Sequence, residues 1–392
     1  MKIDDKTSHN SPSLRFPEFT GEWERCVLGD VLEFSNTRIN SSELNSGNYV
    51  STENILQNFQ GIVKARSIPE DTNVMAFSCG NILLSNIRPY LKKVWKATFN
   101  GGCSSDVFVL QANSNIDADY LHYVVANDKF IGFVMNGAKG VKMPRGDKNQ
   151  MKTYSLSLPS IKEQRKISRF LSFLDERIAV QNRLIDRLQS LIKGINRTIF
   201  TGSGLEYSLC DVCEIRSGYS GNQLQGGKGL GVSRIETISA HNINLERIGY
   251  VAPFDASENY RLQVGDILFS NINSVEYIGN TAFIDKDYNL YHGMNLLRLI
   301  PFRNVVVPFY LYILLNTNRM LKHFKTICNK AVSQASINQK ELGKTIVMLP
   351  SLEKQKQVCN IYQAMYSKLK TEKDVLSFYQ EQKRYLLRHM FI

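Results

Sequence analysis

The sequence predicts an α+β fold in which two pseudo-symmetric bodies of mixed α/β structure are separated by two long antiparallel coiled-coil helices. Three observations lead to this prediction. The chain has 392 residues with 43% hydrophobic and 21% charged content, which is an ordinary globular composition and enough for two or three domains. Its second half repeats its first half. Each half ends in a heptad pattern that is typical of a coiled coil.

The repeat consists of matching segments at a nearly constant spacing. Leu158-Pro159-Ser160-Ile161-Lys162-Glu163-Gln164 returns as Leu349-Pro350-Ser351-Leu352-Glu353-Lys354-Gln355, which lies 191 residues later. Upstream, Gly80-Asn81-Ile82-Leu83-Leu84-Ser85 returns as Gly265-Asp266-Ile267-Leu268-Phe269-Ser270 at a spacing of 185 residues. Because the spacing grows along the chain, the second copy must carry extra residues in its loops.

In chain order, the sequence divides into five segments. Residues 1–20 form a polar N-terminal tail, residues 21–159 a first body, residues 160–200 a central helix, residues 201–350 a second body, and residues 351–392 a C-terminal helix. Within the bodies, the Gly80 and Gly265 segments predict a turn that leads into a buried strand. Residues 120–125 and 310–315 follow Asp or Pro starts and predict helices.

The two long helices share one seam of residues that alternates steps of four and three. Its members are Ile167, Leu171, Leu174, Ile178, Ile185 and Leu188 in the first helix, and Val358, Tyr362, Met365, Leu369, Leu376 and Tyr379 in the second. Both copies interrupt the seam at the same rung, with Gln181 and Glu372. Sustained heptads favour a helical partner. Two amphipathic helices that pack separately on their own bodies remain the alternative.

Several classes of protein are excluded by the sequence. The longest apolar run, residues 305–315, has 11 residues, whereas a membrane-spanning helix needs about 20. The first ten residues lack the apolar core of a secretory signal. Seven scattered cysteines do not suggest a disulfide framework. We therefore interpret the protein as cytoplasmic.

No catalytic or metal-binding pattern is found. The six histidines are isolated, and the Cys210-Asp211-Val212-Cys213 segment lacks a second cysteine pair at zinc-ribbon distance. The glycine-rich residues 226–231 fit neither the P-loop nor the dinucleotide-binding pattern. No Asn-Pro-Pro-Tyr or Asp-Pro-Pro-Tyr tetrapeptide of a methyltransferase occurs. The sequence therefore predicts no catalytic residue and no metal site, so any chemistry must come from a partner.

The charge of the chain favours a polyanionic partner. The net charge is +12 and the isoelectric point is near 9.2. Residues 160–200 carry +5 and residues 351–392 carry +4, so most of the excess lies on the two helices. These charges either bind phosphate or form a solvated face.

Basic and amide side chains also cluster inside the nearly neutral bodies. Lysine and arginine neutralise phosphates, whereas arginine, asparagine and glutamine can read base edges. The candidate DNA-binding residues are Asn86, Arg88, Lys92, Lys93, Lys139, Lys142 and Arg145 in the first body, and Asn271, Asn273, Lys330, Ser333 and Gln334 in the second. For each of the base-reading candidates, a role in capping a loop is equally compatible with the sequence.

Together these features resemble the DNA-specificity subunit of type I restriction-modification systems. The resemblance is carried by Leu14-Arg15-Phe16-Pro17-Glu18-Phe19 with Trp23, by Leu28-Gly29-Asp30, by Ser85-Asn86-Ile87-Arg88-Pro89, and by the two Leu-Pro-Ser-(Ile/Leu)-x-x-Gln helix openings. It covers nearly the whole chain. One departure is that the second copy has Asn271-Ile272-Asn273-Ser274 where the first has Asn86-Ile87-Arg88-Pro89.

The resemblance implies two target-recognition domains, each reading one half of a split DNA site, with the two helices as a ruler between them. It also implies a non-catalytic subunit of a DNA adenine methyltransferase and endonuclease complex that serves in phage defence. Its partners would be double-stranded DNA, two methyltransferase subunits and the restriction/translocase subunits. The chain itself would bind no cofactor, because S-adenosylmethionine, ATP and magnesium belong to the partner subunits.

Two other functions are compatible with parts of this pattern. One is a self-sufficient fused restriction-methylation enzyme, which the missing cofactor motifs disfavour. The other is an interaction scaffold with no DNA role, which selective DNA binding in the presence of the partner would exclude.

Overall fold

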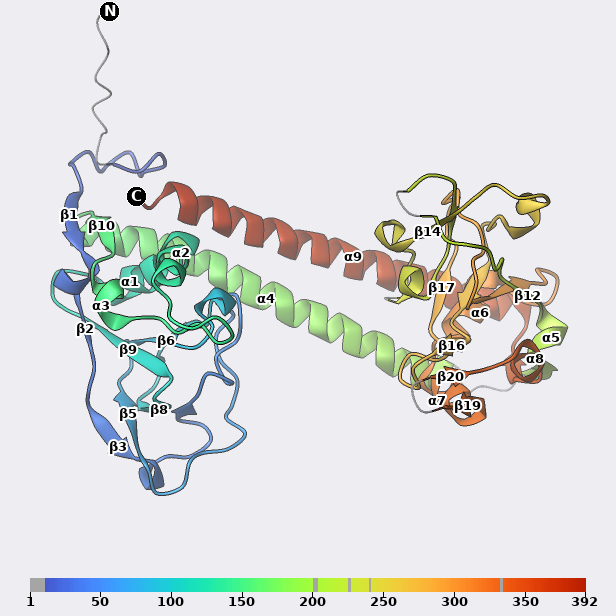
Figure 1. Cartoon of the computed structure of the whole chain (residues 1–392), viewed down its shortest axis with the longest axis horizontal. Helices are drawn as coiled ribbons and strands as arrows, with labels where there is room; N and C mark the ends of the chain where they lie inside the picture. Colours follow the sequence, from blue (N-terminus) through green and yellow to red (C-terminus); the bar gives the residue numbers. More distant parts are fainter. Residues whose placement is uncertain (1–10, 200–203, 225–226, 240, 332–333) are drawn as a thin grey trace, which may run out of the picture. The chain divides into compact units, whose positions relative to one another are not determined.

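The computed structural model describes residues 11–199, 204–224, 227–239, 241–331 and 334–392 (Figure 1). The chain divides into two units. Unit 1 comprises the residues up to Arg183 together with Asp374–Ile392, and unit 2 comprises Leu184–Lys373. Each unit therefore contains one body, a part of the central helix α4 (Ile161–Ile199) and a part of the C-terminal helix α9 (Leu352–His389).

The body of unit 1 mixes short strands and short helices. Its strands are β1 (Glu24–Val27), β2 (Leu32–Phe34), β3 (Arg38–Asn40), β4 (Tyr49–Val50), β5 (Asn73–Phe77), β6 (Ile82–Ser85), β7 (Val94–Lys96), β8 (Gly101–Cys103), β9 (Val107–Ala112) and β10 (Ser155–Leu158). Its helices are α1 (Ala118–Val125), α2 (Asp128–Asn136) and α3 (Lys148–Lys152), with 3₁₀ turns η1 (Leu28–Asp30), η2 (Ser41–Glu43) and η3 (Pro89–Leu91).

A four-stranded sheet in the order β2-β9-β6-β7 divides the core of unit 1. Successive side chains of a strand point to opposite faces. Accordingly Ile82 and Leu84 pack on one face with α1, α2 and the start of α4, while Leu83 packs on the other face with Trp95. Gly80 has a φ of +92°, so the expected turn before β6 is confirmed. The second face is covered by the sheet β3-β5-β8-β4 (Figure 1).

The body of unit 2 is built from a similar set of elements. Its strands are β11 (Leu205–Ser208), β12 (Cys213–Ser217), β13 (Leu230–Val232), β14 (Gly249–Val251), β15 (Ile267–Phe269), β16 (Ile272–Asn273), β17 (Thr281–Phe283), β18 (Leu297–Pro301), β19 (Asn329–Lys330), β20 (Ala335–Ser336) and β21 (Ile346–Leu349). Its helices are α5 (Leu209–Val212), α6 (Pro308–Leu315), α7 (Asn318–Ile327) and α8 (Gln339–Gly343), with 3₁₀ turns η4 (Ile235–Ile238), η5 (Leu245–Arg247) and η6 (Ser257–Tyr260).

The sheet of unit 2 repeats the strand order of unit 1. The order β12-β18-β15-β17 matches β2-β9-β6-β7 strand for strand, and the β11-β21 pair matches β1-β10. In β15, Ile267 and Phe269 pack on one face and Leu268 on the other, as Ile82, Leu84 and Leu83 do in β6. The two bodies are therefore two copies of one α+β fold, as the sequence repeat predicts.

The repeated Leu-Pro-Ser-(Ile/Leu)-x-x-Gln motif ties each long helix to its body. Gln164 Oε1 accepts a hydrogen bond from the Asp117 N–H at 2.8 Å, and Gln164 Nε2 donates to the Pro159 carbonyl at 2.9 Å. Gln355 repeats both bonds with the Val307 N–H and the Pro350 carbonyl, also at 2.8 and 2.9 Å. Asp117 and Val307 are the N-cap residues of α1 and α6, so the glutamine joins the starts of two helices in each unit.

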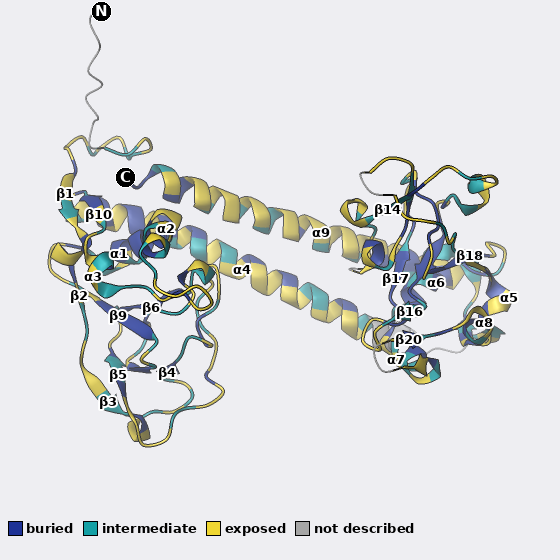
Figure 2. Ribbon diagram, in the orientation of Figure 1, coloured by how far each residue is buried: buried dark blue, intermediate teal, exposed yellow. Residues whose placement is uncertain are grey.

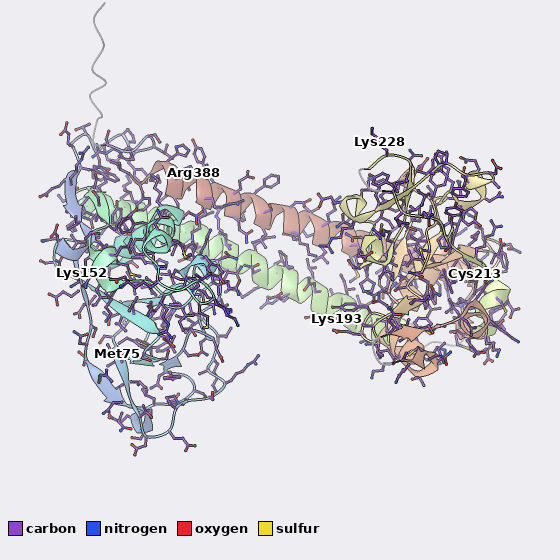
Figure 3. All side chains as sticks on the ribbon, in the orientation of Figure 1. Met75, Lys152, Lys193, Cys213, Lys228 and Arg388 are labelled. Carbon is purple, nitrogen blue, oxygen red and sulfur yellow. The ribbon has the colours of Figure 1, made fainter. Side chains whose placement is uncertain are left out.

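The α4 and α9 helices run antiparallel. In unit 1 the start of α4 packs with the end of α9, and in unit 2 the end of α4 packs with the start of α9. Both helices are exposed over most of their surface (Figure 2). All twelve residues of the expected seam are buried or half-buried, as are Gln181 and Glu372. Arg388 marks the end of α9 in unit 1, and Lys193 marks the part of α4 in unit 2 (Figure 3).

A polar cluster joins α1, α4 and α9 in unit 1. The Tyr123 hydroxyl donates to Asp175 Oδ2 at 2.8 Å, and Lys383 Nζ lies 2.5 Å from Asp175 Oδ1. In unit 2, the match of α1 with α6 gives Ile313 as the equivalent of Tyr123, and the 191-residue repeat gives Tyr366 for Asp175 and Ile192 for Lys383. Ile192 and Ile313 belong to one apolar cluster. The same rung is therefore ionic in unit 1 and largely apolar in unit 2.

Residues 11–20 of the expected polar tail pack against unit 1. The Arg15 guanidinium forms two hydrogen bonds with the Glu163 carboxylate, at 2.7 and 2.8 Å, and Glu163 is nearly fully buried. The Phe16 ring packs edge-on against Phe170 of α4, and the Leu14 N–H donates to the His389 carbonyl at 3.0 Å. Arg15 and Phe16 thus dock this segment onto unit 1. Residues 1–10 lie outside the described residues.

The C-terminal residues also belong to unit 1. The buried Phe391 ring stacks on Tyr120 of α1, with centroids 5.1 Å apart. Lys129 Nζ donates to the Phe391 carbonyl at 3.2 Å, and Asn127 Nδ2 donates to the Leu387 carbonyl at 3.1 Å. The first body is therefore completed by the end of the chain.

Candidate nucleic-acid interface

A small three-stranded ribbon stands out in unit 1, and we call it ribbon 1. It is formed by residues 86–88, 144–146 and Lys139, with residues 144–146 in the middle. The Arg88 N–H donates to the Pro144 carbonyl at 2.8 Å, and the Gly146 N–H donates to the Asn86 carbonyl at 3.1 Å. Lys139 and Arg145 exchange two backbone hydrogen bonds, each of 2.9 Å. Residues 140–144 form the turn between them.

Unit 2 has the same element at the equivalent place, and we call it ribbon 2. Its strand order is β16-β20-β19, and β16 begins one residue after Asn271. The Ile337 N–H donates to the Asn271 carbonyl at 2.9 Å, which repeats the bond between Gly146 and Asn86. Lys330 pairs with Ala335 in ribbon 2, whereas the paired residues Lys139 and Arg145 of ribbon 1 are one residue further apart in the sequence. The two ribbons share a frame and differ at their turns.

The two ribbon asparagines point inward. Asn86 Oδ1 and Asn271 Oδ1 are both buried, and neither has a hydrogen-bond partner among the described residues. Asn271 Nδ2 donates to the Ile337 carbonyl at 3.3 Å, across ribbon 2. The Asn271 side chain therefore supports ribbon 2, and neither asparagine presents its oxygen at the surface.

Ribbon 1 carries four basic side chains at its surface. Arg88 is exposed, with its backbone in the left-handed region at a φ of 51°. Among the described residues, Arg88 and Lys142 have no acidic partner. Lys139 Nζ lies 2.8 Å from Asp147, which raises the pKa of Lys139, and Arg145 lies 3.6 Å from Asp106. Both of these pairs are largely exposed, and exposed ion pairs are weak enough to yield to a phosphate.

Lys92 and Lys93 are turned toward the protein itself. Lys92 Nζ lies 2.6 Å from Asp128 of α2, and Lys93 Nζ donates to the Thr52 carbonyl. Burial lowers the pKa of Lys93. The structure therefore separates these two lysines from the other candidates of the first body, which ribbon 1 brings together.

Ribbon 2 carries fewer charges. Lys330 and Gln334 are exposed, whereas Asn273 is half-buried and its Nδ2 donates to Ser270 Oγ at 3.0 Å. The fifth candidate, Ser333, lies outside the described residues. Ribbon 2 thus presents one cation and one amide at positions where ribbon 1 presents cations and apolar groups.

Two exposed apolar residues of ribbon 1 were not among the sequence candidates. Val141 is fully exposed and the Met143 side chain is about half exposed, at 103% and 47% of their reference areas. In the sequence they look like ordinary loop residues. Their only signal is that they flank Lys142 in a short segment between Gly140 and Gly146.

Two other features would point to a different function, namely a metal centre and a membrane-spanning helix. The part of the chain that the structure describes holds no group of three or more histidine, cysteine, aspartate or glutamate side chains that could bind a metal ion. No described helix is both long and apolar enough to cross a membrane. The two ribbons are therefore the surface features that best match the sequence candidates.

Comparison with known families gives one result for both halves of the chain. A sequence profile described as the type I restriction modification DNA specificity domain matches residues 20–190 and, separately, residues 205–377. The two matches cover most of the chain, one match for each copy of the repeat.

Curated relatives carry the same description. The chain is 38% identical over 187 residues to the MjaX specificity subunit of a type I restriction enzyme from Methanocaldococcus jannaschii. That match covers 47% of this chain and 44% of the relative, so it spans less than half of that protein. The MjaVIII specificity subunit from the same organism is 25% identical over 415 residues, which cover 94% of this chain and 90% of the relative.

Solved structures with the same fold extend over nearly the whole chain. The S subunit of a type I restriction-modification system from M. genitalium matches with a TM-score of 0.62 at 17% identity, covering 97% of this chain and 99% of that one. A chain from a study of complex assembly and conformational transition of the type I R-M system matches with a TM-score of 0.59 at 20% identity, covering 93% and 96%. The likeness concerns the fold of the two bodies and their long helices.

Proposed function

The chain belongs to the type I restriction-modification DNA specificity family, and on that premise we propose that each of its bodies reads one half of a split, asymmetric DNA site. Ribbon 1 and ribbon 2 are the reading elements. A β-ribbon fits a groove of duplex DNA, with cations on the phosphates and other side chains at the base edges.

The observation that carries this proposal is that the two ribbons share one backbone arrangement but differ in their turns. Both ribbons use the same strand order and the same inward asparagine, at Asn86 and Asn271. Ribbon 1 presents Arg88, Lys142 and Arg145, whereas ribbon 2 presents Lys330 and Gln334. Two equal frames with different side chains suit two half-sites of different sequence.

The second part of the proposal is that the chain is a scaffold for other subunits. Large apolar side chains are exposed on α4 at heptad spacing, away from the seam that faces α9: Phe170, Phe173, Val180, Leu184 and Leu191. Such a stripe suits a helical partner. Two methyltransferase subunits would bind along the helices, and the restriction/translocase subunits would join that complex.

The chain itself would be non-catalytic in this complex. S-adenosylmethionine, ATP and magnesium would be bound by the partner subunits. The purified chain, freed of partners and given labelled S-adenosylmethionine and duplex DNA, should neither methylate nor cut. Robust turnover by the partner-free chain would refute this part of the proposal.

An exchange of bodies tests the reading of two half-sites. Residues 21–159 are replaced by the first body of another member of the family, and methylated adenines are mapped in cells that supply the partner subunits. Only one half of the methylated sequence should change. The matched exchange of residues 201–350 should change only the other half. A change in both halves after either single exchange would contradict the proposal.

A further inference from the structure

The turn of ribbon 1 ends in an apolar tip, formed by Val141 and Met143 on either side of Lys142. Val141 is fully exposed, and Met143 is about half exposed. Gly140 has a φ of +92°, and a Cβ there would lie 3.2 Å from the Met143 carbonyl oxygen. This glycine lets the chain turn tightly, so the two apolar side chains stand at the outer end of the ribbon.

A paired stem holds this tip in place. Lys139 and Arg145 exchange two backbone hydrogen bonds, and residues 144–146 are bonded on their other side to residues 86–88. Asp147, directly after the ribbon, caps α3 by accepting from the Asn149 and Gln150 N–H groups. The tip is therefore fixed at both ends to the body of unit 1.

The surroundings of the tip are cationic. Lys142 stands inside it and Arg145 and Lys139 flank it, while Arg88 lies on the neighbouring strand. The two acids nearby, Asp147 and Asp106, form only exposed pairs with Lys139 and Arg145. Protein–protein interfaces are depleted of lysine, whereas a ring of cations around an apolar tip is complementary to the phosphates on either side of a groove lined by bases.

Resting on the proposed function, we propose that the tip of ribbon 1 enters a groove of duplex DNA, where Val141 and Met143 contact the bases. Lys142 and Arg145 bind the phosphates at the edges of that groove. Apolar side chains read bases by packing on the thymine methyl group or between base steps. The tip thus adds sequence selectivity that the cations alone cannot supply.

Ribbon 2 reads its half-site by different chemistry. The 191-residue repeat gives Gln334 as the equivalent of Met143, and Gln334 is exposed. A glutamine amide can form two hydrogen bonds with adenine, which an apolar side chain cannot form. One ribbon therefore reads mainly by apolar contact and the other by hydrogen bonding.

The test uses the chain in complex with its methyltransferase partner. Methylation mapping first supplies the recognised sequence, and short duplexes then carry either both half-sites or one scrambled half-site. The main variant is V141T/M143Q, which keeps the shape of both side chains, makes them polar, and copies Gln334 at one position. Val63→Thr is the control, because Val63 is a half-exposed valine in another loop of the same body.

V141T/M143Q should lower the ratio of affinities for matched over scrambled duplexes by about tenfold or more at one half-site and should leave that ratio unchanged at the other. Its salt dependence should stay unchanged, because no cation is removed. Lys142→Gln should instead weaken binding to all duplexes and lower the salt slope by about 0.9. Val141→Ile should keep full selectivity, and Val63→Thr should behave as the unaltered chain.

Three results would overturn the inference while leaving DNA reading by this chain intact. They are unchanged selectivity of V141T/M143Q, an equal loss at both half-sites, or a loss shared with Val63→Thr. If the unaltered complex shows no selectivity for any duplex, the proposed function itself fails. Equal thermal unfolding curves for all variants show that the exposed tip can be changed without harm to the fold.

Discussion

Replacing Arg15 by methionine should destabilise unit 1 selectively. Arg15 lies in the segment before the first body and binds both oxygens of the Glu163 carboxylate, at 2.7 and 2.8 Å. The Glu163 side chain is 2% exposed and that of Arg15 is 15% exposed. Methionine keeps the length of the aliphatic stem and removes the guanidinium, so a buried carboxylate would remain without its partner.

The expected cost follows from this burial. Removing one partner of a buried ion pair costs about 3 to 5 kcal/mol, and the lower end applies here because water can reach the Arg15 side. For a unit of about 200 residues, each kcal/mol shifts the melting temperature by roughly 2 to 4 °C. The melting temperature of unit 1 should therefore fall by about 6 to 12 °C.

Tryptophan fluorescence can follow unit 1 alone. The chain has two tryptophans, Trp23 and Trp95, and both are buried in the core of unit 1. Their emission during heating reports unit 1, while far-ultraviolet circular dichroism reports both units. The shift should appear in the fluorescence transition.

Two variants control for this interpretation. Arg165→Met removes a guanidinium from α4, the helix that carries Glu163, but Arg165 is 71% exposed and lies 3.4 Å from Asp117, so its loss should cost less than about 1 kcal/mol. The double variant R15M/E163M removes the buried charge as well and should recover much of the lost stability. If Arg15→Met shifts the transition no more than Arg165→Met does, the ion pair is not what holds this segment.

Three further predictions follow from the same structure. Phe391→Ala removes the ring that stacks on Tyr120 and should lower the free energy of unfolding of unit 1 by about 3 kcal/mol; an unchanged fluorescence transition would contradict this. Burial lowers the pKa of His122 to about 4, below its value of about 6.5 in the unfolded chain, so the unfolded chain binds a proton more readily. The free energy of unfolding of unit 1 should therefore fall by about 3 kcal/mol as the pH falls from 6.5 to 4. His122→Phe should remove that part of the pH dependence, and an equal pH dependence in the variant would contradict this prediction. A four-residue insertion between Ile178 and Ile185 should lengthen α4 by about 6 Å and the spacer between the half-sites by one or two base pairs; an unchanged spacer in an active variant, seen by methylation mapping, would show that the helices do not set that distance.

The sequence predicts the architecture well because the signals for it are repeated and periodic. The 191-residue spacing relates both long helices, and the heptad steps identify the residues that are buried between them. The same spacing identifies Gln164 and Gln355 as equivalent, but their role becomes visible only in the structure. Each glutamine binds the N-cap residue of a helix more than 40 residues away, which no local pattern reveals.

The interface is harder to predict because it depends on contacts between distant segments. Residues 86–88 pair with residues 144–146, and nothing in either segment indicates the pairing. Composition alone places Lys92 and Lys93 among the DNA-binding candidates, yet each ammonium is turned to a partner within the body. The docking of residues 11–20 escapes prediction for the same reason, since Arg15 looks like any polar residue until Glu163 is placed beside it.

The ionic rung in unit 1 has a consequence for how chains associate. A protein with two similar long helices risks pairing the α4 helix of one molecule with the α4 helix of another. In an antiparallel pair of that kind, the 191-residue equivalence would set Asp175 against Ile192 of the second molecule, without Lys383. A pair of α9 helices would likewise set Lys383 against Tyr366. Either mispairing would leave a charge without its partner at a half-buried rung. The duplicated helices can therefore recognise each other within one chain and discriminate against copies of themselves.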